Sequence, residues 1–280
     1  TIDQLLDRYT EVRQRIADAA TRAGRRGQEV LLVAVTKHAD PEQVRALIDA
    51  GHRDFGENRV QHLVQQAAMV EEYFQRLRVL PAGRRQIAEQ AAETLFPASG
   101  SPRFAQAHLA GDRPVRWHMI GHLQRNKARR VTDFVRLVHS VDSLRLAEEL
   151  QQIAVKRDQP IDVLVQVNCS GEESKFGCPI PAAIPLAEQI DTMLNVRVRG
   201  VMTMAEPGIG EARTRATFSR CREAFDEMKR AGVGEGRLNI LSMGMSGDYE
   251  WAIAEGANIV RVGSAIFGER QDTGEPEEPA

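Results

Sequence analysis

The sequence predicts an α/β fold, a (β/α)8 TIM barrel with one extra N-terminal helix. Short apolar runs typical of buried parallel strands alternate with helical patterns along most of the 280 residues. Eight such units on roughly 250 residues match the repeat and size of this barrel. The main alternative is a doubly wound open sheet, which normally carries a glycine-rich turn after its first strand. The segment TKHAD (36–40) is not such a turn, so the barrel is favoured.

The extra helix is predicted over residues 1–24. Thr1 and Gln4 have the spacing of a capping box, apolar residues then recur at helical intervals, and Gly24 ends the pattern. The run VLLVAVT (30–36) follows as the first strand of the barrel, because it is continuously apolar in the way that buried parallel strands are.

Seven further strands alternate with helices after this point. Asp40 and Pro41 suit the N-cap and first turn of a helix that runs to Gly51, and further helical patterns cover 143–158 and 216–232. The remaining strand candidates are RDFGEN (53–58), VRWHMIG (115–121), RLVHSVD (136–142), IDVLVQVN (161–168), VRVRGVMTM (196–204), LNILSMGMS (238–246) and NIVRVGSAI (258–266).

Two segments interrupt the alternation. Residues 68–113 lie between the second and third units and indicate an insertion, with a helix-like piece at 84–95. The tail 271–280 is acidic and rich in proline, which predicts disorder. We therefore expect a single barrel domain over residues 1–270 and a disordered tail.

The composition excludes several classes of protein. The net charge is −2 and no polybasic cluster occurs, which argues against nucleic acid and membrane surfaces as partners. The three cysteines are an odd number and form no C-x-x-C pair, so neither a disulfide framework nor a zinc site is indicated. The N-terminus has no signal-peptide core and no apolar run approaches the ~20 residues of a membrane helix. We expect a cytoplasmic protein.

Functional side chains should gather where the predicted strands end. In a TIM barrel the chemistry lies at the C-terminal ends of the strands, so correct segmentation should place such residues just after the apolar runs. The residues at or near these positions are Lys37, Glu57, Asn58, His118, Asn126, Asn168, Ser170, Met204, Ser246, Gly263 and Ser264.

Lys37 is the most informative of these residues. Burying an ammonium is costly, and a lysine that loses its proton in such a setting becomes a nucleophile for carbonyl groups. The alternative is a lysine that reaches the barrel rim, or one that pairs with Glu57 or Asp54.

The seventh and eighth units favour a phosphate ligand. SMGMSGD (242–248) and RVGSAIFG (261–268) place Ser and Gly between a strand and a helix start, where exposed backbone N–H groups bind phosphate. Ordinary turn chemistry explains either loop alone. Arg261 ends the eighth strand and should point toward the barrel mouth, unless it pairs with an acidic neighbour. An amine, a phosphate site and an arginine together suggest pyridoxal 5′-phosphate (PLP); an aldolase acting on a sugar phosphate satisfies the first two features as well.

Several motifs resemble one known family. They are VAVTKHAD, FGENRVQ, WHMIGHLQRNKARRV, VQVNCSGEESKFG, RGVMTM and LSMGMSGDYEWAIAEGANIVRVGSAIFGER, and the likeness extends over nearly the whole chain apart from 68–113 and the tail. They are similar to the pyridoxal phosphate homeostasis protein family. The resemblance implies a fold-type III PLP-binding barrel like the N-terminal domain of alanine racemase, without that enzyme's C-terminal domain. It also implies a role in vitamin B6 homeostasis with no established catalysis.

The resemblance assigns roles by position. It makes Lys37 the lysine of the internal aldimine and Arg261 the residue that faces the pyridine nitrogen. It places phosphate binders at Ser246, Gly263 and Ser264, and residues close to the ring at Asn58 and Met204. The chain departs from the family pattern at Ala39, where a second lysine is usual, and at Ser264, where threonine is frequent.

The expected function is therefore a PLP carrier or reservoir, not an enzyme. An arginine opposite the ring nitrogen disfavours the protonated ring, which weakens the ring as an electron sink. A racemase or lyase is the alternative, but Tyr9, Tyr73 and Tyr249 all fall on helical segments and none matches the second base of a racemase. We expect a monomer whose partners are PLP and PLP-dependent apoenzymes. His118 and His122 have too few neighbouring ligands to predict a metal site.

Overall fold

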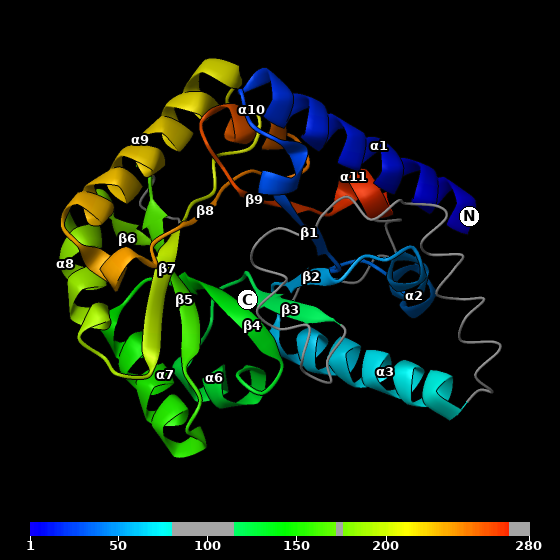
Figure 1. The fold of residues 1–280 in the computed structure, drawn as a ribbon, viewed down its shortest axis with the longest axis horizontal. Helices are drawn as coiled ribbons and strands as arrows, with labels where there is room; N and C mark the ends of the chain where they lie inside the picture. Colours follow the sequence, from blue (N-terminus) through cyan, green and yellow to red (C-terminus); the bar gives the residue numbers. More distant parts are fainter. Residues whose placement is uncertain (80–114, 172–175, 269–280) are drawn as a thin grey trace.

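A computed structural model describes residues 1–79, 115–171 and 176–268. Eight parallel strands close into a barrel in the order β4-β3-β2-β1-β9-β8-β7-β5, and β5 pairs with β4 to complete the circle (Figure 1). The predicted TIM barrel is thus confirmed. The strands are β1 (Leu31–Val35), β2 (Asp54–Glu57), β3 (Arg116–Met119), β4 (Val135–Val141), β5 (Ile161–Asn168), β7 (Val196–Met202), β8 (Ile240–Ser242) and β9 (Ile259–Val262).

Helices follow the strands and surround the barrel (Figure 1). They are α2 (Pro41–Asp49), α3 (Val60–Val79), α6 (Arg125–Val131), α7 (Leu144–Arg157), α8 (Ile180–Asp191), α9 (Glu211–Arg230), α10 (Tyr249–Ala254) and α11 (Ser264–Phe267), with short 3-10 turns at Gly27–Glu29 and Val233–Gly236. Among these described helices, none is long and apolar enough to cross a membrane.

Each predicted strand is found, and most are shorter than the apolar run that predicted them. One strand was not predicted, the two-residue β6 (Cys178–Pro179), which pairs with the end of β5. Of the predicted insertion, residues 68–79 form the second half of α3. The rest of it, including the helix-like piece at 84–95, lies outside the described residues, as does the tail 271–280.

The N-terminal helix α1 (Ile2–Arg22) is also confirmed. Thr1 and Gln4 form the predicted capping box, in which each side chain bonds the other residue's backbone N–H. The buried face of α1 carries Leu5 and Tyr9 and lies on α10 and α11, at the far end of the sequence (Figure 1). Burying one such side chain stabilises the fold by about 1.5–3 kcal/mol, so α1 fastens the last β/α unit of the barrel.

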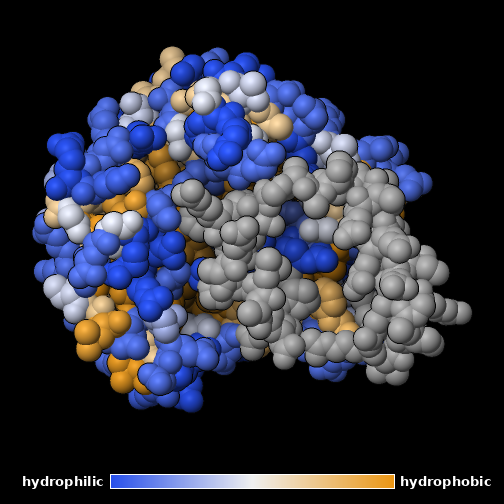
Figure 2. Space-filling view, in the orientation of Figure 1, coloured by the Kyte–Doolittle hydropathy of each residue, from blue (hydrophilic) through white to orange (hydrophobic). Residues whose placement is uncertain are grey.

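The core has two parts because strand side chains alternate between the two faces of a closed sheet. The larger part lies between the strands and the helices. A smaller cluster fills the inside of the barrel and consists of Val33, Leu137, Leu164, Met202, Ile240 and Ile259. The outer surface in Figure 2 is largely hydrophilic, in keeping with a chain of which 27% is charged.

Gly200 lets β7 approach β8 closely. A Cβ atom added at Gly200 would lie 1.7 Å from the carbonyl oxygen of Ile240, its partner in β8. The backbone there also has a φ of +156°, which side chains rarely adopt. Any side chain at this position must push the two strands apart.

We predict that Gly200→Ala lowers the free energy of unfolding by about 3 kcal/mol, because the strands separate or the backbone distorts. Gly208→Ala is the matched control. Gly208 has a φ of +77° but no atom within 4 Å of an added Cβ, so it should lose only about 1 kcal/mol from backbone strain. Urea unfolding measures both; equal losses would contradict the steric argument.

Candidate functional site

The pairing of β1 with β9 brings the two ends of the sequence together at one rim. The strands are parallel and in register, with Ala34 opposite Val262. The two segments stay close one residue past the end of β9, because a Cβ added at Gly263 would lie 3.3 Å from Cβ and O of Val35. Lys37 and Ser264 follow directly after these positions. Both therefore leave the barrel at its C-terminal end, on neighbouring strands.

Lys37 itself is half-buried. Its position is set by the residue before it. Thr36 is completely buried, its backbone N–H donates to the carbonyl of Gly56 (3.0 Å), and its hydroxyl donates to Oε1 of Glu57. Glu57 is also completely buried, so this contact ties the exit of β1 to the exit of β2.

His62, at the start of α3, completes this anchor. Its Nδ1 lies 3.0 Å from the same Glu57 oxygen. The hydrogen bond that His62 donates to Glu57 raises the pKa of His62 above its usual value of 6.5, against the opposing effect of burial. The anchor of Lys37 thus includes one histidine whose pKa is raised by its contact with a buried carboxylate.

Asn58 follows Glu57 and is half-buried on the same rim. Gly121, from the loop after β3, lies against its backbone, since a Cβ added at Gly121 would be 2.1 Å from the Asn58 carbonyl oxygen. The side-chain oxygen of Asn58 is buried and has no hydrogen-bond partner in the part of the chain that the structure describes. A ligand with a donor group would satisfy it.

The loops after β8 and β9 are joined through Ser246. Its hydroxyl oxygen accepts hydrogen bonds from the backbone N–H groups of Gly263 (3.1 Å) and Ala265 (3.3 Å). The hydroxyl of Ser264 is exposed beside them. These two N–H groups are thus already used, and the hydroxyls of Ser246 and Ser264 are the donors suited to an anion. The phosphate binders expected from the sequence, Ser246, Gly263 and Ser264, therefore lie together.

Arg261 lies below this rim, with its side chain directed into the barrel. It is 3% exposed, and it donates from Nη1 to Ser242 Oγ (2.5 Å) and from Nη2 to the Thr203 carbonyl (2.9 Å). Burial lowers the pKa of Arg261 to about 10, although the nearby charge of Asp248 opposes this. Its hydrogen-bond partners are thus neutral groups instead of the acidic neighbour considered as an alternative. Met204 packs against the interior cluster after β7.

The prediction that His118 lies near the rim was wrong. His118 is inside β3, 2% exposed, and bonds to Asp54 and His139 deeper in the barrel. His122 does lie in the exit loop, where its ring stacks on Phe176 at 4.4 Å. Over the described ranges, no group of three or more His, Cys, Asp or Glu residues could hold a metal ion.

Sequence reasoning missed the polar residues inside the barrel. Ser242 and His139 follow the interior residues Ile240 and Leu137 by two positions, so strand alternation places them on the same face. The alternation of side chains along each strand could therefore have identified both residues. Both lie within runs that predict buried strands, and such runs give no reason to expect polar side chains inside the barrel.

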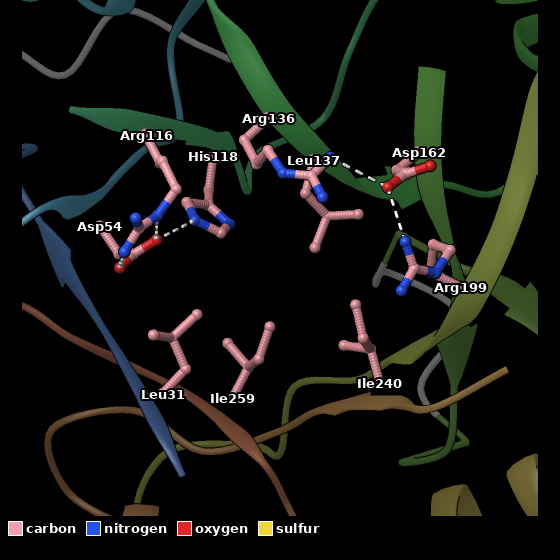
Figure 3. A pocket seen from close by; sticks show the side chains of 10 residues that line it. All are labelled: Leu31, Asp54, Arg116, His118, Arg136, Leu137, Asp162, Arg199, Ile240 and Ile259. Atoms are coloured by element: carbon pink, nitrogen blue, oxygen red, sulfur yellow. Dashed lines mark hydrogen bonds and ion pairs between the residues drawn. The ribbon is translucent and has the colours of Figure 1, made fainter. Parts of the chain in front are cut away.

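A separate pocket opens at the other end of the barrel (Figure 3). It measures about 470 Å³, including the space open to solvent at its mouth. Two ion-pair groups lie on its wall, Asp54 with Arg116, and Asp162 with both Arg136 (3.0 Å) and Arg199 (2.8 Å). Leu31, Leu137, Ile240 and Ile259 form its apolar side. The N-terminal ends of the strands surround this pocket, so it is distinct from the rim that carries Lys37.

Comparison with known proteins gives consistent matches. Residues 9–271 match the family model for the alanine racemase N-terminal domain. The pyridoxal phosphate homeostasis protein of Pseudomonas aeruginosa is 37% identical over 273 residues, which is 97% of this chain and 98% of that protein. The solved structure of PipY from Synechococcus elongatus with PLP bound is 32% identical, with a TM-score of 0.64 over 90% of this chain and 100% of that one.

A third match shows the fold alone. Alanine racemase from Clostridium difficile superposes with a TM-score of 0.66 over 97% of this chain and 58% of the enzyme, at 13% identity. The chain therefore spans the barrel domain of that enzyme, as the sequence predicted.

We predict that His62→Gln destabilises the protein more at acid than at alkaline pH. Since the folded pKa of His62 lies above the unfolded value, its ion pair with Glu57 is fully present below about pH 6.5 and is lost as the pH rises through the raised pKa. The expected loss is about 1 kcal/mol at pH 5.5 and smaller at pH 8.5. Urea unfolding at both pH values measures it; a loss independent of pH would show that His62 contributes only packing.

Proposed function

The chain belongs to the pyridoxal phosphate homeostasis protein family, and from that premise we propose that it binds PLP at the C-terminal rim of its barrel and serves PLP homeostasis as a carrier. The relative from Pseudomonas aeruginosa carries that name, and PipY has been solved with PLP bound. Both match this chain over at least nine-tenths of its length.

The observation that carries the proposal is the grouping of three unlike donors at neighbouring strand ends. An amine follows β1, an anion-binding cluster follows β8 and β9, and a donor-only guanidinium lies on β9 between them. The unpartnered oxygen of Asn58 adds an acceptor on the same rim. These residues fit PLP, which supplies an aldehyde that a lysine amine can bond, a phosphate and a pyridine nitrogen.

Each residue has a definite task in this proposal. Lys37 offers its amine to the aldehyde carbon, held in place by the contact of Thr36 with Glu57. The hydroxyls of Ser246 and Ser264 donate to the phosphate, which lies beside Gly263. Asn58 and Met204 flank the ring.

Arg261 supports a carrier over a catalyst. A guanidinium donates hydrogen bonds and accepts none, so the ring nitrogen opposite it must be the acceptor and stays without a proton. A ring in that state withdraws electrons weakly. Arg261 can fill this role because its hydrogen bonds to Ser242 and Thr203 take up only two of its five N–H groups.

A racemase or lyase is the second candidate, because the matched family model is named for alanine racemase. Two tyrosines expected on helices are engaged away from the rim. Tyr9 on α1 bonds His52 (3.1 Å), and Tyr73 on α3 donates to Asp49 (2.5 Å). Incubation of the PLP-loaded protein with a panel of amino acids in heavy water separates the two functions. Rapid exchange of an α-proton would favour the enzyme.

The proposed partners follow from the carrier role. PLP-dependent apoenzymes would receive the cofactor from the open rim, and the protein would act as a cytoplasmic monomer. The three cysteines are all free and buried, which suits a reducing compartment.

We predict that borohydride reduction of the PLP-loaded protein leaves one pyridoxyl group on Lys37. Mass spectrometry of the digested protein should find it on the peptide that contains this lysine. Lys37→Ala should abolish the adduct, because Lys37 is the lysine that follows β1.

Lys127→Ala is the matched control for this experiment. Lys127 is also half-buried and lies in α6, but it does not follow a barrel strand. This variant should retain the full adduct. A pyridoxyl group on another lysine of the wild-type protein would contradict the assignment.

We also predict that Ser246→Ala and Ser264→Ala weaken binding of PLP about tenfold, the effect of one hydrogen bond to a charged group. Their affinity for pyridoxal, which has no phosphate, should be nearly unchanged. Titration followed by absorbance gives both constants. If either variant weakened PLP and pyridoxal equally, its serine would not be a phosphate ligand.

A further inference from the structure

The pocket at the N-terminal end of the barrel has a charged side and an aliphatic side (Figure 3). The charged side carries the two ion-pair groups described above, and Arg136 lies between them in the view of Figure 3. Leu31, Ile259 and Ile240 line the opposite side, and Leu137 lies beside Arg136. The pocket therefore offers a single occupant both an ionic and an apolar surface.

The lining of this pocket contains more positive than negative charge. It has three guanidinium groups, from Arg116, Arg136 and Arg199, and two carboxylates, from Asp54 and Asp162. One cation is thus left without an anion of its own within the lining. His118 also lies on this wall, and a proton on its ring would only increase the excess of positive charge.

Arg136 has more unused N–H groups than the other two arginines. Its Nη1 donates to Asp162 Oδ2 (3.0 Å), and its other four N–H groups have no partner in the part of the chain that the structure describes. Arg199 donates to the same Asp162 oxygen (2.8 Å). Asp162 would therefore keep an arginine partner if Arg136 bound a ligand, and the guanidinium fork matches the two oxygens of a carboxylate.

The depth of the lining residues sets the orientation of an occupant. The side chains of Arg116 and Arg136 are 24% and 29% exposed, which places them near the mouth. Leu137, Ile240 and Ile259 are at most 5% exposed and belong to the cluster that fills the inside of the barrel. An anionic group would thus meet the arginines near the mouth, and an attached apolar group would lie deeper, against this cluster.

The same lining selects among anions. Aliphatic side chains offer water no hydrogen bond, so an alkyl chain that covers them is favoured, by about fourfold in affinity for each buried CH₂ group. A phosphate dianion suits the pocket less well, because its second negative charge exceeds the one spare cation and is repelled by Asp54 and Asp162. A monoanion with a short alkyl chain satisfies both sides.

We infer that this pocket is a second binding site, which takes a short-chain aliphatic carboxylate and holds its carboxylate group on Arg136. The site lies at the end of the barrel opposite the proposed PLP site, and neither site requires the other. Because the ligand binds only the folded barrel, it stabilises the fold in proportion to its occupancy.

Methyl ¹³C NMR tests the site with acetate, propanoate and butanoate as probes. All three should shift the methyl signals of the aliphatic lining residues saturably, with a Kd that falls about fourfold for each added CH₂ group. Butan-1-ol, which has no charge, should bind about tenfold more weakly than butanoate. Absence of saturable shifts at these methyl groups, or equal affinity for acetate, butanoate and butan-1-ol, would overturn the inference.

Competition experiments test the class of ligand. Inorganic phosphate and PLP should both fail to displace butanoate from these methyl groups. Displacement by phosphate at the concentration of butanoate itself would show a site for inorganic anions. Displacement by PLP would show that the two sites are not separate, and either result would contradict the proposal.

Arg136→Met tests the residue that holds the carboxylate. It keeps an unbranched side chain and removes the guanidinium, so it should raise the Kd for butanoate about tenfold. Arg157→Met is the matched control. Arg157 on α7 is 27% exposed and pairs with Asp133 (3.1 Å), but it does not line the pocket, so this variant should bind butanoate as the wild type does.

Unchanged affinity in Arg136→Met would overturn the role of Arg136. If this variant did not fold, Arg136→Lys would replace it. Lysine keeps the positive charge but loses the fork of N–H groups, so Arg136→Lys should still weaken butanoate binding. The chain-length series in the wild-type protein needs no variant and decides by itself whether the site exists.

Discussion

The parallel pairing of β1 with β9 is the constraint on which the site depends. These strands stand at opposite ends of the sequence, and they become neighbours only when the barrel closes. Their register puts Val35 against Gly263, so the amine that follows β1 and the donors that follow β9 emerge at the same height. Helix α1 reinforces this closure by packing on α10 and α11. Without this pairing, the residues of the site would no longer lie close together.

The two ends of the barrel carry different sets of polar residues, and further polar side chains lie inside the barrel between them. The N-terminal end carries acidic and basic groups that form ion pairs with one another, Asp54 with Arg116 and Asp162 with two arginines. The C-terminal end carries Lys37, Ser246 and Ser264, which are proposed to bind PLP. Between them, buried polar side chains are tolerated because each one is hydrogen-bonded to the next.

Much of this structure was predictable because local signals were strong. The alternation of strand and helix patterns located all eight strands, and the caps at Thr1 and Asp40 located two helix starts. The rule that strand ends carry the chemistry, together with the family resemblance, brought Lys37, Ser246 and Arg261 to one rim. Side-chain partners were harder to predict. Contacts such as Thr36 with Glu57, or His118 with His139, join strands that lie 21 residues apart, and only the closed barrel shows which neighbours meet. His118 was misplaced for this reason, since nothing local distinguishes a polar residue at a rim from one inside a strand.

The central claim is that Lys37, Arg261 and the loops after β8 and β9 bind one PLP molecule together. A crystal structure of the protein grown with PLP tests this most directly. The account predicts density continuous with Lys37 Nζ, the phosphate against Ser246, Gly263 and Ser264, and the ring nitrogen facing Arg261. PLP density in the pocket lined by Arg116, Arg136 and Arg199, or a ring nitrogen facing a carboxylate, would contradict it.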